Sequence, residues 1–187
     1  IVWGGPSLTV TGAANLTVST TLATTATTID AGDFTGKLNI TAGNVADAGA
    51  VSGFDAVDLT VTGGAGNDTL NVAAVAATKE RLVDAGDGDD TVTIGSALTA
   101  AATATAGDVI KGGDGDDTLV MTAALAAGMT TATSTGVSGF ETLSISDTLT
   151  TSITVANTQA GISNVALQAT TAAGTVVGPA GSLTVSQ

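Results

Sequence analysis

The chain has 187 residues with 17 acidic and 4 basic side chains, for a formal net charge of −13. Nucleic acid and anionic lipid would repel so negative a surface, which argues against both as partners. The sequence contains no cysteine and no histidine, so disulfides and the usual zinc ligands are excluded, and any metal must be bound by oxygen atoms.

Short segments with alternating apolar residues, typical of β-strands, recur along the whole chain. In chain order they are 7–10, 15–19, 37–41, 57–62, 69–72, 91–94, 118–121, 142–146, 152–155 and 182–186. Helical signals are confined to 73–82 and 122–128, where alanine-rich loops are an equally good interpretation. No apolar run approaches the roughly 18 residues of a membrane helix. Because the chain lacks an initiator methionine and a leader, we expect an internal or processed piece of a longer protein.

Internal repeats are the main clue to the fold. Asp68, Asp90 and Asp117 lie 22 and 27 residues apart in nearly identical strings of eight residues, and a second repeat links 51–59 with 137–145. Strands that recur at this spacing, without a helix long enough to connect them, predict an all-β solenoid of parallel strands. The alternative is an antiparallel sandwich in which the Asp-Gly pairs form hairpin turns.

The repeated glycine-aspartate strings have the composition of metal-binding turns. Glycine permits a tightly curled backbone that directs several carbonyl oxygens at one point, and the aspartates add carboxylates. Such oxygen ligands suit calcium. Asp68, Asp90 and Asp117 are the principal ligand candidates, and a turn-capping role is the alternative. The full set of candidate metal-site residues is Gly63, Gly64, Gly66, Asn67, Asp68, Asp84, Gly86, Asp87, Gly88, Asp89, Asp90, Gly112, Gly113, Asp114, Gly115, Asp116 and Asp117.

Other acidic residues have more open roles. Asp84 and Asp108 flank the turns, where we expect them to support the sites or to be solvated. The segment 27–41 is a looser relative of the repeats, and its Asp30 and Asp33 are candidates for a further ion. The residues that follow Gly-Phe in the second repeat are expected in structural turns: Asp55 and Glu141.

The few aromatic and basic residues allow three further expectations. Phe54 and Phe140 should pack inside the fold at junctions between coils. Trp3 either caps the solenoid or docks on a neighbour. The basic cluster 79–81 is expected to lie in a solvated loop.

The turns carry a resemblance to a known motif. Residues 63–71 and 112–120 match the calcium-binding RTX nonapeptide G-G-x-G-x-D-x-U-x in full, and 85–93 matches with Ala85 in place of the first glycine. RTX nonapeptides usually follow one another directly, whereas 13 and then 18 residues separate them here. We therefore expect calcium along one edge, with ordinary loops such as 73–81 and 95–106 along the other.

The order of these turns, followed by G-F-E-T-L, resembles the lattice-forming regions of calcium-dependent bacterial surface-layer proteins. The resemblance covers 51–146, whereas 1–50 and 147–187 share only composition and strand pattern. It implies one continuous right-handed parallel β-roll over 1–187. Residues 1–50 would then be degenerate repeats, 51–146 the calcium-binding core and 147–187 further coils.

The functional expectation follows from this resemblance. A secreted structural protein, exported by type I secretion, would fold on binding Ca²⁺ and assemble with its own copies on the bacterial surface. Calcium bridges to cell-surface polysaccharide would be a further contact, and no membrane insertion is expected. The alternatives are a module of an RTX adhesin or biofilm-matrix protein, and the accessory β-roll of a secreted hydrolase. Since histidine, cysteine and tyrosine are absent, we do not expect this segment to be an enzyme.

Overall fold

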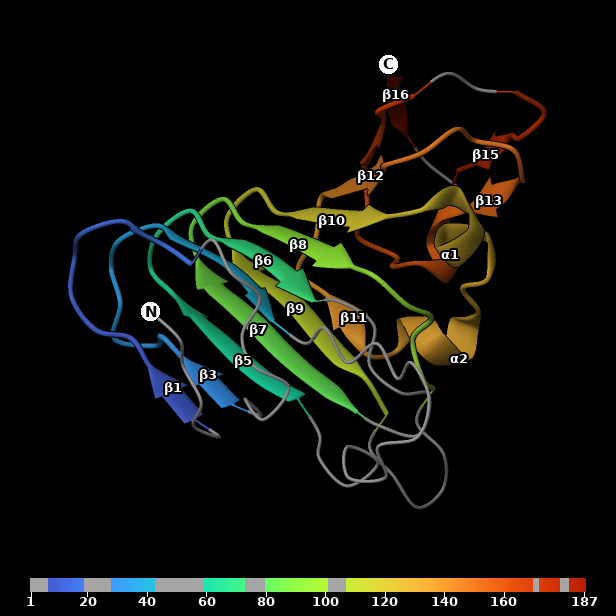
Figure 1. Cartoon of the computed structure of the whole chain (residues 1–187). Coiled ribbons are helices and arrows are strands. Elements are labelled where there is room, and N and C mark those ends of the chain that lie inside the picture. Colours follow the sequence, from blue (N-terminus) through green and yellow to red (C-terminus); the bar gives the residue numbers. More distant parts are fainter. Residues whose placement is uncertain are drawn as a thin grey trace.

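The computed structural model describes residues 7–18, 28–42, 59–72, 80–100, 107–169, 172–178 and 182–187. In these parts the chain winds into stacked coils, and successive strands alternate between two sheets that enclose a common core (Figure 1). Four residues discussed above lie outside the described parts: Trp3, Phe54, Asp55 and Lys79.

Six of the odd-numbered strands form one sheet, in the order β1-β3-β5-β7-β9-β11. They are β1 (Ser7–Thr9), β3 (Thr28–Asp30), β5 (Leu59–Gly64), β7 (Arg81–Asp87), β9 (Val109–Asp114) and β11 (Val137–Ser138). Two further odd-numbered strands form a separate pair, β13 (Ile153–Thr154) and β15 (Val176–Val177).

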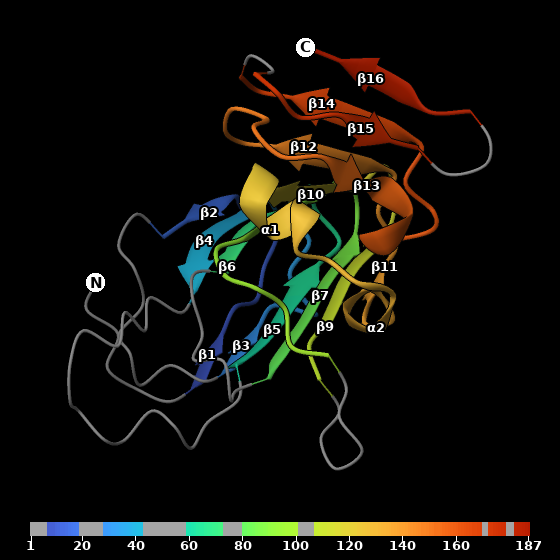
Figure 2. The same ribbon diagram turned by 90° about the vertical axis from the view of Figure 1, so that its right-hand side faces the viewer.

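The even-numbered strands form an eight-stranded sheet whose edge strands are β2 and β16 (Figure 2). They are β2 (Leu16–Thr17), β4 (Leu38–Ala42), β6 (Thr69–Val72), β8 (Thr91–Ile94), β10 (Thr118–Met121), β12 (Thr142–Ile145), β14 (Asn164–Leu167) and β16 (Thr184–Ser186). Every strand pair in the described parts is parallel. The fold is therefore a parallel β-solenoid, as the repeats predict, and the antiparallel sandwich is wrong.

The core consists of aliphatic columns that run from coil to coil. In the even-numbered sheet, one column stacks four residues that are each at most 1% exposed: Leu70, Val92, Leu119 and Leu143. The odd-numbered sheet supplies a matching column of Ile29, Val61, Val83 and Ile110. Burying each such side chain stabilises the fold by about 1.5–3 kcal/mol. The alternation of apolar and polar residues in the sequence thus gives each sheet an inner and an outer face.

Short helices occupy the connection between β10 and β11. Thr122 caps α1 (Ala123–Ala127) by accepting a hydrogen bond from the Leu125 backbone N–H at 3.2 Å. A capping box precedes α2 (Thr131–Ser134), and a 3₁₀ turn, η1, spans Val155–Asn157. The helical signal at 122–128 is confirmed, whereas residues 81 and 82 of the other segment begin β7 and its residues 73–79 lie outside the described parts. No helix among the described residues is long and apolar enough to cross a membrane.

A buried ion pair corrects two expectations from the sequence. Arg81, expected in a solvated loop, is only 2% exposed, and its guanidinium lies 2.7 Å from Oδ2 of Asp108, which is 3% exposed. The Arg81 backbone N–H also donates to Asp108 Oδ1 at 2.7 Å. The reason is register: β7 and β9 pair Leu82 with Val109, so the residues just before them are neighbours. Asp108 is therefore neither solvated nor close to the glycine-aspartate turns.

Phe140 has the packing role expected of it. The side chain is fully buried where β11 turns into β12. The side-chain amide of Gln159 holds the Phe140 backbone by accepting from its N–H at 3.1 Å and donating to its carbonyl at 3.0 Å. The next coil thereby fixes this turn in place.

Candidate metal centre

The three glycine-aspartate turns lie above one another at one edge of the solenoid. They connect β5 with β6, β7 with β8, and β9 with β10, and each is short because the strands on either side end at the same edge. In the paired strands, Gly64 lies beside Gly86, and Gly86 beside Gly113. Gly113 has φ of +124°, and a Cβ added there would overlap the Gly86 carbonyl oxygen. Glycine is therefore required here by both backbone conformation and coil spacing.

Asp68, Asp90 and Asp117 form a continuous column inside this edge. Each precedes a strand of the even-numbered sheet, and strand register places them one above another. All three are at most 1% exposed. The backbone N–H of Asp68 donates to Asp90 Oδ1 at 2.7 Å, and that of Asp90 donates to Asp117 Oδ1 at 2.8 Å. Each carboxylate thus binds the backbone of the preceding coil.

The column continues beyond the residues that the sequence singled out. At one end, Asp68 Oδ1 accepts the Leu38 N–H at 2.7 Å, so Leu38 occupies the position where the next carboxylate would lie. At the other end, Glu141 Oε2 accepts the Asp117 N–H at 2.8 Å. Sequence reasoning assigned Glu141 only to a structural turn. The signal that would have placed it in the column is its position before Thr-Leu, which Asp68 and Asp117 share.

Two carboxylate oxygens in the column have no partner. Asp90 Oδ2 and Asp117 Oδ2 are buried and make no hydrogen bond, whereas Asp68 Oδ2 accepts the Gly64 N–H at 3.1 Å. A buried ionised oxygen without a partner is costly, and a bound cation removes that cost. These two atoms are the part of the column best suited to contact a cation.

The electrostatics of the column favour neutralisation. Burial is the main cause that raises the pKa of Asp90 to about 7, and the neighbouring charges of Asp68, Asp117 and Asp89 add to the increase. The hydrogen bond with the Asp68 backbone lowers this pKa, but by less. Burial also raises the pKa of Asp68, and burial together with the charge of Glu141 raises that of Asp117. The column therefore takes up either protons or a positive ion more readily than ordinary carboxylates do.

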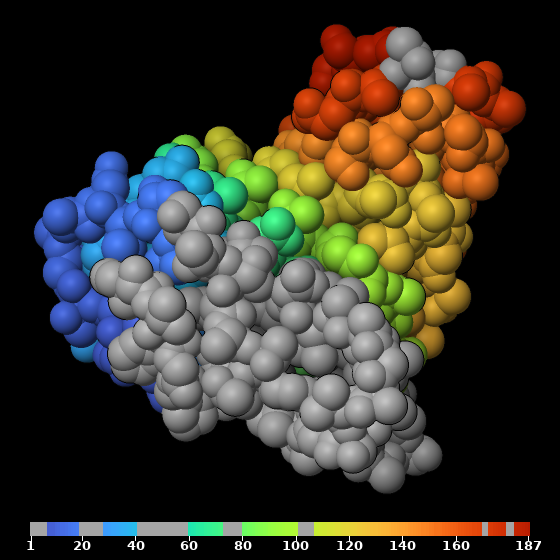
Figure 3. All heavy atoms as spheres, viewed as in Figure 1, coloured from blue at the N-terminus to red at the C-terminus, as the bar shows by residue number. Residues whose placement is uncertain are grey.

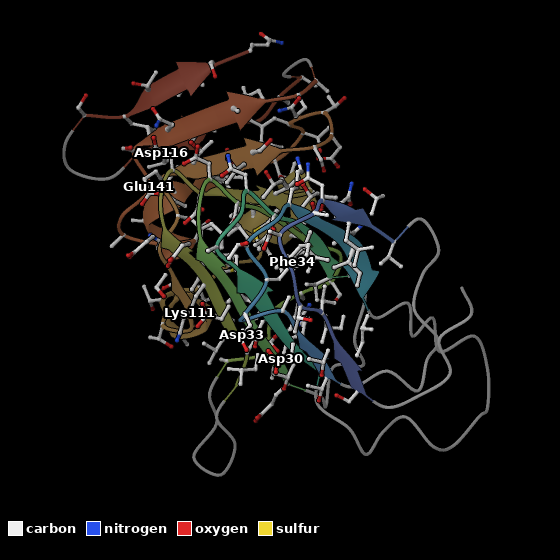
Figure 4. The ribbon with its side chains drawn as sticks, turned by 90° about the vertical axis from the view of Figure 1, so that its left-hand side faces the viewer. Asp30, Asp33, Phe34, Lys111, Asp116 and Glu141 are labelled. Carbon is white, nitrogen blue, oxygen red and sulfur yellow. The ribbon has the colours of Figure 1, made fainter. Side chains whose placement is uncertain are left out.

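A second set of acidic side chains lies on the outside of the same turns. Asn67 Oδ1 accepts the Asp89 N–H at 3.1 Å, and Asp89 Oδ1 accepts the Asp116 N–H at 3.1 Å. Asp87 stacks beside Asp114 in the paired strands, and these outer side chains are exposed. Figure 4 shows Asp116 beside Glu141 at this edge. The turn edge thus has an inner and an outer layer of negative charge.

The side chains of the column could bind calcium only if backbone carbonyl oxygens also acted as ligands. No group of three or more acidic side chains among the described residues is arranged to hold a metal ion by itself. A cation at the orphaned oxygens of Asp90 and Asp117 would have to draw on turn carbonyls as well. Calcium accepts mixed sets of six to eight carboxylate and carbonyl oxygens with flexible geometry, so these residues fit it better than magnesium, which demands a near-ideal octahedron.

The remaining candidates lie away from the column. Asp84 is on the outer face of β7, where it forms an exposed 3.2 Å ion pair with Lys111. In the 27–41 segment, Asp30 Oδ1 accepts the Gly32 N–H at 3.1 Å and Asp33 is exposed. Figure 4 shows Asp30, Asp33 and Lys111 apart from Asp116 and Glu141. The structure does not bring these residues together with the column.

Comparisons with protein-family models, curated proteins and solved structures found no match.

Proposed function

We propose that this chain is a calcium-dependent β-roll segment of a bacterial surface-layer protein, which folds outside the cell and assembles with its own copies. The observation that carries the proposal is the buried column of Asp68, Asp90 and Asp117, with two carboxylate oxygens that have no partner. The secreted, self-assembling role is supported by the repeated glycine-aspartate turns, by the lack of cysteine and by the resemblance to surface-layer regions.

Calcium would act by linking folding to metal binding. Without a cation, closely stacked carboxylates repel one another, and the net charge of −13 adds to that repulsion. The core of the described residues is largely aliphatic with few aromatics, and its burial must outweigh both this repulsion and the chain entropy. A cation between coils would neutralise the column, and its binding free energy would become folding free energy.

An affinity typical of extracellular calcium modules would confine folding to the outside of the cell. Extracellular calcium modules bind at roughly 10⁻⁴ to 10⁻³ M. A chain with such affinity would stay unfolded in a low-calcium cytosol, as type I secretion requires, and fold after export. The exposed outer carboxylates Asp87, Asp89, Asp114 and Asp116 would serve calcium bridges to surface polysaccharide or to other copies.

The test is a calcium titration of chelator-treated protein, followed by far-UV circular dichroism, light scattering and electron microscopy. We expect β-structure to appear between about 0.1 and 1 mM calcium, and ordered sheets to follow. Magnesium at the same concentration is the control and should be much less effective. Folding without assembly would favour an RTX adhesin module, and β-structure that ignores calcium would refute the proposal.

A further inference from the structure

The two edge strands of the eight-stranded sheet are open at opposite ends of the solenoid. Among the described residues, β2 pairs with β4 alone, and β16 pairs with β14 alone. Figure 3 shows the N-terminal and C-terminal coils at opposite ends of the molecule. An edge strand presents unpaired backbone N–H and C=O groups, which form a template for another strand.

The core column is less buried at these ends than in the middle of the sheet. Val165 is fully buried because Val185 of β16 lies against it, whereas Val185 itself is 49% exposed. At the other end, the Val18 N–H donates to the Asn39 carbonyl, and Val18 is only partly buried. Val18 and Val185 are thus the two ends of one column of core side chains. In the part of the chain that the structure describes, each has a neighbouring strand on one side, whereas the members between them have one on both sides.

Neither end carries the charges that usually protect an edge. All 21 charged residues lie between Asp30 and Asp147, so residues 1–29 and 148–187 are uncharged in a chain of net charge −13. Proteins normally protect edge strands with charged residues or proline. Two copies that meet at these ends would keep their acidic turns apart.

The two edges also carry the same sequence. Residues 16–19 and 183–186 both read Leu-Thr-Val-Ser. A coil-like register would place Leu183 on Leu16, Thr184 on Thr17 and Val185 on Val18. Stacked identical positions are already the rule inside this solenoid, where Thr69, Thr91, Thr118 and Thr142 form such a column.

We propose that β16 of one copy pairs in parallel with β2 of a second copy, so that the solenoid continues from molecule to molecule. This contact joins two different surfaces and therefore generates an open filament rather than a closed dimer. It goes beyond the calcium function and needs only a folded solenoid. The partner in this contact is a second copy of this chain. If further coils of a longer chain cover the two ends instead, the proposal is wrong.

Cysteine cross-linking tests the contact directly, because the natural chain has no cysteine. In Thr17→Cys/Thr184→Cys, the two positions would be adjacent across the contact. Within one copy they are separated by seven strand spacings, roughly 34 Å at about 4.8 Å each, which is too far for a disulfide. The control is Thr17→Cys/Thr118→Cys, whose second site has the same outward register in the middle of the sheet.

On mild oxidation, we expect a ladder of disulfide-linked oligomers from the 17/184 variant and none from the 17/118 control. Ladders from both variants, or from neither, would overturn the proposal. Running both with calcium and with chelator separates the two claims. Linkage between 17 and 184 in protein that folds without calcium would support the contact while refuting the calcium function. If calcium induces ordered two-dimensional assemblies but positions 17 and 184 do not cross-link, the calcium function is supported and the contact is refuted.

A charge placed on the open end provides an independent readout. Val185→Lys leaves the single copy little changed because Val185 is half-exposed, but it would bury a charge in the contact. By sedimentation velocity, we expect association to weaken by about tenfold or more, which corresponds to 1.4 kcal/mol or more. Leu82→Lys is the matched control, since Leu82 is 48% exposed on the side of the solenoid. Equal effects of the two variants would contradict the proposal.

Discussion

The substitution Asp90→Asn distinguishes a metal-binding role of the carboxylate column from a purely hydrogen-bonding role. Asparagine keeps an oxygen that accepts the Asp68 N–H, which Asp90 Oδ1 binds at 2.7 Å, but it removes the charge. If the column holds calcium, the variant should be more stable than the natural protein in chelator, and calcium should remove half or more of that advantage. If the column is only a hydrogen-bonded ladder, calcium should leave the difference between the two proteins unchanged.

The expected size of these two differences follows from the electrostatics of the column and from the calcium affinity. Burial raises the pKa of Asp90 from 3.8 to about 7, and one pKa unit corresponds to 1.36 kcal/mol, so full ionisation opposes folding by about 4 kcal/mol. Since the column titrates as a coupled set, a single replacement should recover about half, or about 2 kcal/mol in chelator. About 5 mM calcium, 5 to 50 times the expected dissociation constants, would stabilise the natural protein by about 1–2.3 kcal/mol per site.

Far-UV circular dichroism over a calcium titration measures both differences at neutral to mildly basic pH. A gain of about 2 kcal/mol multiplies the folded-to-unfolded ratio of Asp90→Asn in chelator by roughly 30, so its β-signal there should exceed that of the natural protein. Asp84→Asn is the control, because it removes the same charge from an exposed pair worth about 1 kcal/mol or less and should leave the calcium response intact. If Asp90→Asn responds to calcium as fully as the natural protein, the metal interpretation of the column is refuted.

Three further predictions follow from the same contacts. In chelator, the folded fraction should fall as pH rises from about 4 through 7, because the raised pKa of Asp90 favours folding only while that carboxyl is protonated; a β-signal that rises over this range would contradict the burial argument. In calcium, Arg81→Met should lower the unfolding free energy in urea by about 3–5 kcal/mol, because it leaves Asp108 buried without its countercharge. Lys111→Met, which breaks the exposed pair, should cost about 1 kcal/mol or less, and similar losses from both would contradict the distinction. Gly12→Ala, at φ +116° with no atom near its Cβ, should cost about 1–2 kcal/mol, whereas Gly113→Ala should cost more because its Cβ overlaps the Gly86 carbonyl; equal losses in thermal melts would show that coil spacing does not require the glycine.

The repeats made the fold and the principal column predictable. Asp68, Asp90 and Asp117 hold equivalent positions in the sequence, and a solenoid converts equivalent positions into neighbours in space. The strands of the even-numbered sheet were visible because they alternate cleanly, as in 69–72 and 91–94. Parallel stacking followed from the spacing of these segments.

Several odd-numbered strands could not be recognised from local pattern. β7 and β9 contain the glycines of the turns, Gly86 and Gly113, which read as loop residues because glycine is depleted in strands. They become strands because the coils on either side supply backbone partners. That stabilisation is tertiary and leaves little mark on the sequence.

The Arg81–Asp108 pair was misjudged for a related reason. The two residues are 27 positions apart, and only the pairing of Leu82 with Val109 makes them neighbours. A cluster of charged residues normally predicts a solvated loop. Burial of both partners overrides that expectation, and it depends on a register that no local pattern specifies.

The calcium claim is tested most directly by a crystal structure of the protein grown in millimolar calcium, with anomalous diffraction to locate the ions. We predict calcium at the turn edge, with Asp90 Oδ2 and Asp117 Oδ2 about 2.3–2.6 Å from ions that also bind turn carbonyls. A folded solenoid in which both oxygens remain buried without an ion would contradict the account.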